Sequence, residues 1–358
     1  MGDFGNVQMN KRIFKSQTLD SGDVPFYKIG TFGKKADAYI SSELYEEYRN
    51  KYPYPKDGDL LISASGSIGK IVEYKGQRAY YQDSNIVWLD HDNRILNLFL
   101  KAFFQIVKWN GTEGSTIKRL YNKNILNTEI ILPKIKEQTA VGKLIEKFDY
   151  LITLQQRKLE QLKQLKKAML QYLLTTEKKS DPLIRNKNYN NKWDTTTFSK
   201  LLNYERPENY IVTNTNYRKN GIPVLTANKS FILGYTNEPN VYNKGEAIIF
   251  DDFTLENKFV NFPFMIKSSA IKILTSKVNY SLYFIFQLLQ HTKFIKEGHA
   301  RHYISVVQKQ IVKIPPSYEE QESISDTFSR IQSLIKLQQN KIDQYTTLKK
   351  YLLQKMFI

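Results

Sequence analysis

Apolar residues recur at alternating steps of three and four from Glu137 to Leu174, and again from Glu320 to Phe357. A sustained repeat of this kind is typical of coiled-coil helices, and neither stretch contains a proline that would break a helix. We therefore predict two long helices that pack antiparallel. The positions expected to form their shared seam are Ile145, Phe148, Ile152, Gln155, Leu159 and Leu162 in the first, and Phe328, Ile331, Ile335, Gln338 and Ile342 in the second.

The second stretch is a copy of the first. Residues 133–174 align without a gap on residues 316–357, and 15 of the 42 aligned pairs are identical. The polar seam residues Gln155 and Lys166 recur as Gln338 and Lys349. Two unrelated amphipathic helices are the alternative, but they leave these shared polar positions unexplained. We expect an internal pseudo-twofold repeat.

Two globular blocks with a mixed, mostly β pattern accompany the helices. In the first block, short apolar runs between turn residues predict strands at 25–29, 60–63, 68–74 and 85–89, followed by a helix at 96–107. The second block repeats this order with different loops. The predicted fold class is α+β, with divisions at 1–132 (first block), 133–175 (central helix), 176–312 (second block, beginning with a polar linker at 176–192) and 313–358 (C-terminal helix).

Charge narrows the class of partner. The chain has 53 basic and 35 acidic residues, a net charge of +18, which favours a polyanion such as nucleic acid. Basic and amide side chains contact phosphates and base edges. The candidates in loops are Lys11, Arg12, Lys34, Lys35, Ser65, Ser67, Lys70, Arg78, Gln82, Lys118 and Arg119 in the first block, and Arg218, Lys219, Asn228, Lys229, Arg301 and His302 in the second.

Several strings resemble catalytic motifs but do not match them. The run 64–71 lacks the first glycine and the final hydroxyl of a phosphate loop, so we interpret it as a glycine-rich turn whose Ser65, Ser67 and Lys70 approach a phosphate. Residues 261–264 differ from a methyltransferase tetrapeptide at Phe262, and the histidines near position 300 lack a carboxylate partner. We therefore expect no catalytic residue, metal or cofactor. With no cysteine and no apolar segment long enough to span a bilayer, we expect a cytoplasmic protein without a membrane partner.

The pattern as a whole resembles the specificity subunit of a Type I DNA restriction-modification system. The residues that carry the resemblance are Gly22–Gly33, Leu61–Gly69, Gly114–Thr116, Ile249–Phe253, Phe262–Phe264 and the two helix entries in which Pro133 and Pro316 precede Glu-Gln. The resemblance implies two target-recognition domains, each binding half of a bipartite site in double-stranded DNA, held apart by the antiparallel helices. It also implies two modification (methyltransferase) subunits as partners, and leaves open whether a restriction subunit joins.

Two alternatives stay open at this point: a coiled-coil structural or interaction protein, and the specificity module of a related methyltransferase-nuclease. The second block also begins with Trp193 and 198–202 before its body, whereas the first starts at Met1. We therefore expect the family's usual N-terminal segment to be shortened here.

Overall fold

The computed structural model describes residues 1–109, 119–175, 181–228, 230–295 and 301–357. The chain divides into two compact units. Unit 1 comprises residues 1–156 and 341–358, and unit 2 comprises residues 157–340. Both units are sheet-rich and mixed α+β, as predicted.

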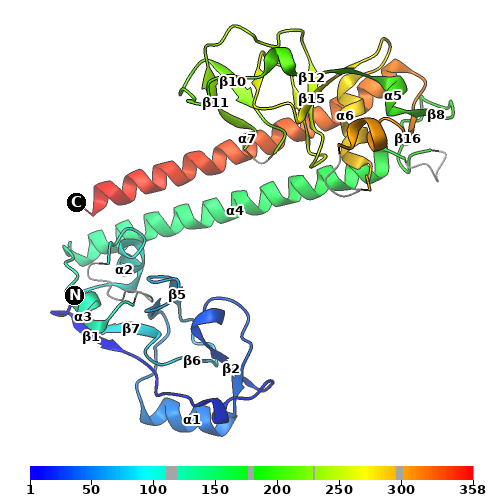
Figure 1. The fold of residues 1–358 in the computed structure, drawn as a ribbon. Coiled ribbons are helices and arrows are strands. Elements are labelled where there is room, and N and C mark those ends of the chain that lie inside the picture. Colours follow the sequence, from blue (N-terminus) through cyan, green and yellow to red (C-terminus); the bar gives the residue numbers. More distant parts are fainter. Residues whose placement is uncertain (110–118, 176–180, 229, 296–300, 358) are drawn as a thin grey trace. The chain divides into compact units, whose positions relative to one another are not determined.

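Unit 1 contains two sheets (Figure 1). Its helices are α1 (Ser42–Lys51), α2 (Asn97–Phe103), α3 (Asn122–Leu126), the first part of α4 (Ile135–Leu173) and the last part of α7 (Tyr318–Met356). Its strands are β1 (Gly5–Gln8), β2 (Val24–Tyr27), β3 (Tyr39–Ile40), β4 (Leu60–Ser63), β5 (Ile71–Glu73), β6 (Tyr80–Tyr81) and β7 (Ile86–His91). The larger sheet is antiparallel, in the order β1-β7-β4-β5, and the smaller has the order β3-β2-β6.

Unit 2 repeats this topology. Its helices are α5 (Phe198–Leu201), α6 (Leu282–His291), the last part of α4 and the first part of α7. Its strands are β8 (Asp194–Thr197), β9 (Leu202–Glu205), β10 (Ile222–Leu225), β11 (Ile232–Thr236), β12 (Ala247–Asp251), β13 (Asn257–Val260), β14 (Met265–Ile266), β15 (Ile271–Ser276) and β16 (Ile311–Ile314). The sheet β9-β15-β12-β13 has the order of β1-β7-β4-β5, and β11-β10-β14 has that of β3-β2-β6.

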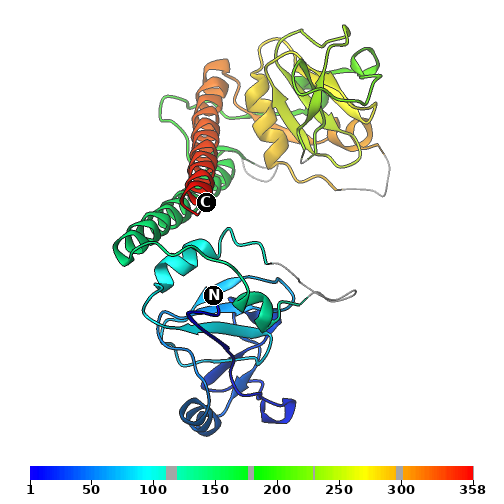
Figure 2. The same cartoon turned by 90° about the vertical axis from the view of Figure 1, so that its left-hand side faces the viewer.

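The middle strand of each smaller sheet has one antiparallel and one parallel neighbour: β2 with β3 and β6, and β10 with β11 and β14. Unit 2 also has the two-stranded sheet β16-β8. Helix α6 lies along the sheet β13-β12-β15-β9 (Figure 2) and buries Phe284, Ile285 and Leu288 in the core of the unit.

The predicted elements form with small differences at their ends. The predicted strand 68–74 is wrong in its first residues, because Gly66 and Gly69 adopt positive φ values of 63° and 77° and form a turn before β5. The predicted helix 96–107 is too long, since α2 ends at Phe103.

The two long helices contact each other within each unit in opposite chain order. In unit 1, Ile145 packs in a cluster with Leu353, and the later residue Asp149 forms an ion pair with the earlier Lys349. In unit 2, Lys166 Nζ donates to Gln332 Oε1 at 2.8 Å, and Leu174 lies in the same core cluster as Ile324. All of the predicted seam residues are buried or half-buried.

A buried glutamine joins the start of each long helix to its unit. Gln138 Oε1 accepts from the backbone N–H of Leu96, the N-cap of α2, at 2.9 Å. Gln321 Oε1 accepts from the N–H of Ser281, the N-cap of α6, at 3.0 Å. Both glutamines are 1% exposed and stand at equivalent places in the repeat. A glutamine at the equivalent position therefore orients each long helix on its own unit.

Candidate nucleic-acid interface

Three loops of unit 1 meet at the end of strand β4. The N–H of Leu120 donates to the carbonyl of Ala64 at 2.8 Å, and the N–H of Ala64 donates to the carbonyl of Asn85 at 2.8 Å. Ser65 Oγ donates to Asn85 Oδ1, also at 2.8 Å. These bonds bring the predicted residues Ser65 and Arg119 to one site.

Arg119 is oriented at this site by two contacts. Its Nη2 donates to the carbonyl of Ser84 at 2.8 Å, and the guanidinium lies 5.9 Å from the centre of the Tyr121 ring. The neighbouring hollow, of 430 Å³, is lined by Met9, Ser84, Arg119, Leu120, Tyr121, Asn122 and Lys123. A half-buried arginine beside an aromatic ring and amide side chains is suited to bind a phosphate or a base edge.

Unit 2 builds the same arrangement at the end of strand β12. The N–H of His302 donates to the carbonyl of Asp252 at 3.0 Å, as Leu120 does to Ala64. Arg301 precedes His302 as Arg119 precedes Leu120, and its guanidinium lies 6.0 Å from the centre of the Phe253 ring. The two arginines therefore occupy equivalent positions in the two units.

Buried polar contacts hold the Arg301 loop in place. The carboxylate of Asp252, in a residue only 3% exposed, accepts from the N–H of Tyr303 at 2.7 Å and lies 3.8 Å from Lys272 Nζ. Asn228 Oδ1 accepts from Thr254 Oγ1 at 3.2 Å, which places this predicted residue at the same loop. His302 is 1% exposed, so its side chain lies in the core of unit 2 and not on its surface.

Other predicted residues of unit 1 lie elsewhere or have internal partners. Lys11 Nζ lies 5.0 Å from the Tyr52 ring and Arg78 pairs with Glu46 at 3.2 Å, so both belong to the side of α1. The Lys70 ammonium donates to the carbonyl of Phe32. The carboxamide of Gln82 accepts from the N–H of Ile29 at 2.9 Å. Lys11 and Arg78 are nevertheless exposed, as are Arg12, Lys34, Lys35 and Ser67 in unit 1 and Arg218, Lys219, Asn228 and Arg301 in unit 2.

Lys118 and Lys229 lie outside the described residues, as do Gly114–Thr116 of the resemblance. Sequence reasoning missed Ser84, Asn85, Tyr121 and Phe253, which orient or surround the two arginines. A signal for the pair was present, because Arg-x-Tyr occurs at 119–121 and again at 301–303, an offset of 182 that nearly equals that of the helices.

Two of the strings that resembled catalytic motifs place an aromatic side chain, Phe264, or a histidine, His302, in the core of unit 2. Phe264 is fully buried and stacks on Tyr242 with ring centres 4.8 Å apart, whereas 261–263 are exposed. No group of three or more His, Asp or Glu residues in the described part of the chain could hold a metal ion. Nor is any described helix both long enough and apolar enough to cross a membrane.

The model of the Type I restriction modification DNA specificity domain matches this chain twice, at residues 1–164 and 182–346. The chain belongs to this family. The two matches each cover one sheet-rich region and most of one long helix, so the repeat seen in the topology is also a repeat of the family's domain.

Individual relatives agree with this assignment. A putative type I restriction enzyme specificity subunit of Haemophilus influenzae is 56% identical over 152 residues, 42% of this chain and 40% of that protein. A type I restriction enzyme specificity subunit of Escherichia coli is 39% identical over 136 residues, 35% of this chain and 33% of that protein. These matches span less than half of either relative.

The fold is similar to that of a solved relative. The S subunit of a Type I restriction-modification system from M. genitalium matches with a TM-score of 0.67 at 13% identity, covering 100% of this chain and 94% of that one. A chain from a structural study of type I restriction-modification complex assembly matches with a TM-score of 0.54 at 14% identity, over 99% and 96% of the two chains.

Proposed function

We propose that this chain is a non-catalytic specificity subunit of a Type I restriction-modification complex, which recognises a bipartite site in double-stranded DNA. The observation that carries the proposal is the doubled family match together with two units of the same topology, each presenting an arginine at the same loop junction. In this proposal, the unit with Arg119 reads one half-site and the unit with Arg301 reads the other.

The remaining candidates divide into two roles. Arginine and amide side chains at the loop junctions, Ser65, Gln82, Arg119, Asn228 and Arg301, are proposed to lie nearest to bases. The exposed cations Lys11, Arg12, Lys34, Lys35, Arg78, Arg218 and Lys219 are proposed to contact phosphates, which supply affinity without sequence information.

The long helices are proposed to form an antiparallel coiled coil that relates the two recognition domains by a pseudo-twofold repeat and sets the gap between half-sites. Two observations support this role. Within each unit, α4 and α7 contact each other while running in opposite chain directions, and the predicted seam residues are buried or half-buried. A helix pair without base-reading loops can impose a distance but cannot itself read sequence.

Two modification subunits are the proposed partners, because the outer faces of the helices carry the same apolar residues twice. Leu154 and Leu337 are 44% and 66% exposed, and Leu165 and Leu348 are 47% and 46% exposed. Each pair occupies one position of the repeat. Exposed leucines on a helix fit an apolar groove or helix of another protein.

Methylome sequencing of cells that express this chain with its modification subunits tests the proposed function. The expected result is a methylated motif with two specific segments and a constant gap. A single continuous motif, or methylation that does not depend on this chain, would contradict the proposal. The purified chain alone is expected neither to methylate nor to cut DNA.

A further inference from the structure

In unit 2, the segment that leads from helix α4 into the sheet-rich domain (residues 194–314) has no regular structure of its own. Residues 181–193 contain neither a helix nor a strand, and most of their side chains are polar. The path out of the domain is short, because only residues 315–317 separate β16 from α7. A backbone without regular structure does not fix a direction. Side-chain contacts of residues 181–193 are therefore needed to orient the domain on α4.

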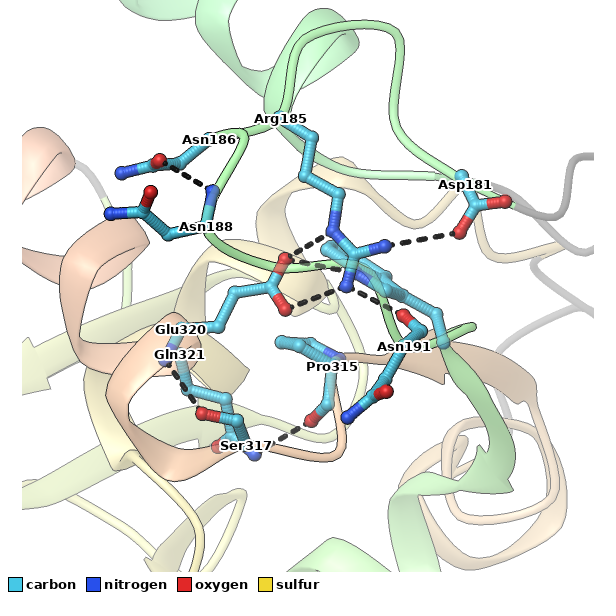
Figure 3. Close-up of polar contacts among 10 residues, drawn as sticks. Asp181, Arg185, Asn186, Asn188, Asn191, Pro315, Ser317, Glu320 and Gln321 are labelled. Carbon is cyan, nitrogen blue, oxygen red and sulfur yellow. Dashed lines mark hydrogen bonds and ion pairs between the residues drawn. The ribbon is translucent and has the colours of Figure 1, made fainter.

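One carboxylate at the start of α7 collects these contacts (Figure 3). Arg185 Nε and Nη2 donate to the two oxygens of Glu320 at 2.7 and 2.8 Å, and Trp193 Nε1 donates to Glu320 Oε1 at 3.2 Å. The N–H of Ile184 donates to the carbonyl of Tyr172 in α4 at 2.9 Å. Arg185, Trp193 and Glu320, which we call the joint, thus connect both long helices of unit 2 to the residue that precedes β8.

The joint is buried and directional. The side chains of Arg185 and Glu320 are 16% and 3% exposed, and Trp193 packs against Phe284 of α6 with ring centres 6.0 Å apart. Two parallel hydrogen bonds between a guanidinium and a carboxylate fix the relative direction of the two groups. Buried ion pairs are often replaceable by neutral side chains of similar volume without loss of stability. The geometry of the pair is therefore its main contribution.

Apolar packing around the joint is incomplete. A hollow of 310 Å³ remains between the segment and the helices, with Leu173, Ile184 and Ile324 among its lining residues. Ile184 is 52% exposed. Apolar contacts are also non-directional, so they hold two elements together without fixing the angle between them. The direction of the segment thus depends on the polar contacts of Arg185.

A small change of angle at the joint is enough to alter which bases are reached. Residues 194–314 are expected to have a radius of gyration of about 14 Å. A side chain about 25 Å from the joint moves by ~3.4 Å, the length of one base-pair step, when the domain rotates by about 8°. A contact that restricts the angle therefore also restricts the position of the reading loops along DNA.

We propose that Arg185 and Glu320 are positioning residues that fix the direction of the sheet-rich domain of unit 2 on the long helices, and so hold the gap between the half-sites to one length. The role in spacing rests on the proposed function. Helix length sets the size of the gap, and the joint keeps that size constant.

Distance measurements between spin labels test the orientation directly. The chain has no cysteine, so Lys219→Cys and Leu334→Cys, at exposed positions of the domain and of α7, carry one nitroxide each. Arg185→Met combined with Glu320→Gln removes both charges at similar volume. This neutral variant is expected to give a broader or shifted distance distribution than the wild-type joint, while the midpoint of thermal unfolding stays near that of the wild type.

Two further variants serve as controls. The exchange of Arg185→Glu with Glu320→Arg restores a pair of opposite charges and is expected to return the distribution toward that of the wild type. Asp181→Asn removes the other carboxylate beside Arg185, at 3.5 Å and with a side chain 38% exposed. It is expected to leave the distribution unchanged, because the bidentate pair with Glu320 remains.

Methylome sequencing of cells that express the same variants with modification subunits tests the role in spacing. The wild type is expected to methylate sites with one gap length. In the neutral variant, methylation of sites whose gap is one base pair shorter or longer is expected to rise about tenfold, or about 1.4 kcal/mol of lost discrimination. Both half-sites should stay the same, and the charge exchange should restore the single gap.

An unchanged distance distribution in the neutral variant, or a single gap length with normal methylation, overturns the proposal. So does a neutral variant that fails to fold, because the pair would then be required for stability rather than for direction. A wild-type motif without a gap contradicts the proposed function and the role in spacing with it. The distance measurement uses no DNA and still decides in that case whether the joint orients the domain.

Discussion

Arg119 and Arg301 illustrate how much of the site depends on single side chains. Each sits beside an aromatic ring at a junction of loops, Arg119 near Tyr121 and Arg301 near Phe253. A guanidinium so placed loses less conformational entropy on binding than one on a flexible loop, and it can donate two parallel hydrogen bonds. These two residues are therefore the strongest candidates for base reading.

Replacing either arginine with Ala is expected to weaken binding of the cognate bipartite DNA by about 1–3 kcal/mol, and to relax specificity in one half-site only. Competition binding with oligonucleotides mutated in one half-site at a time measures this. Lys219→Ala, at an exposed residue, is the control and is expected to lower affinity equally for all sequences. Equal relaxation of both half-sites by Arg119→Ala would contradict the division of roles.

His291 gives unit 2 a predicted pH dependence. Burial, followed by the nearby charge of Lys293, lowers the pKa of His291 below its ordinary value of 6.5. A lowered folded-state pKa means that the unfolded chain binds the proton more readily, so stability is present above pH 6.5 and is lost as the pH falls through the folded-state pKa. Urea unfolding of the wild type and His291→Gln from pH 7.5 to 5.5 is expected to show a smaller decrease in the variant. Parallel curves would exclude this role.

At the scale of elements, a buried glutamine near the start of each long helix contacts the N-cap residue of a shorter helix in the same unit. Gln138 and Gln321 each accept a hydrogen bond from an N-cap N–H. Gln138 also donates to the carbonyl of Pro133, and Gln321 donates to the carbonyl of Pro315. Gly142, one turn further along α4, lies against α2: a Cβ there would come within 2.5 Å of Leu98 Cγ. Close packing and buried polar contacts together orient α2 on α4.

Gln138→Ala and Gln321→Ala are each expected to lower the free energy of unfolding by about 1–3 kcal/mol, because a buried N–H loses its acceptor. Differential scanning calorimetry or urea unfolding measures the loss. Gln156→Ala, at an exposed position of α4, is the control and is expected to change stability little. A loss as large in the control would mean that helix propensity alone explains the effect.

The outer leucines of the helices are expected to bind partners without contributing much to the fold. Leu154→Glu combined with Leu337→Glu is expected to reduce co-purification of modification subunits, while the midpoint of thermal unfolding stays near that of the wild type, since both side chains are exposed. Leu183→Glu, 60% exposed in the linker, should leave co-purification unchanged. Normal assembly of the double variant would exclude this face as the docking surface.

For the whole molecule, the proposed function assigns the reading of DNA bases to the two sheet-rich units and the spacing of the half-sites to the long helices. The two units share their strand orders but differ in the residues at the loop junctions, Ala64 and Leu120 in one and Asp252 and His302 in the other. The helices share sequence instead. In the proposed function, loops that read DNA can change in sequence without changing the helices that set the spacing.

Insertion of one heptad into each long helix, at matching positions of the repeat, is expected to lengthen the unread gap of the target by about three base pairs, from ~1.5 Å per residue and ~3.4 Å per base pair. Both half-sites should stay the same. Methylome sequencing of the variant reads the new motif directly. A changed half-site with an unchanged gap would show that the helices do not set the spacing.

The sequence by itself determined what depends on local and periodic patterns. The two long helices, the seam residues from Ile145 to Ile342 and the strand at 60–63 follow from repeats of three to four residues or short apolar runs between turns, which neighbours along the chain are enough to define. The repeat also let the family be recognised from its two Pro…Glu-Gln helix entries.

Only the tertiary structure decided which loop residues share a site. Arg119 lies at the end of β4 because the next residue, Leu120, bonds to the distant Ala64, and Arg301 lies at the end of β12 because His302 bonds to Asp252. The same contact accompanies the burial of His302. Pairing between distant strands and the burial of a polar side chain depend on contacts across the fold, which the order of polar and apolar residues does not specify.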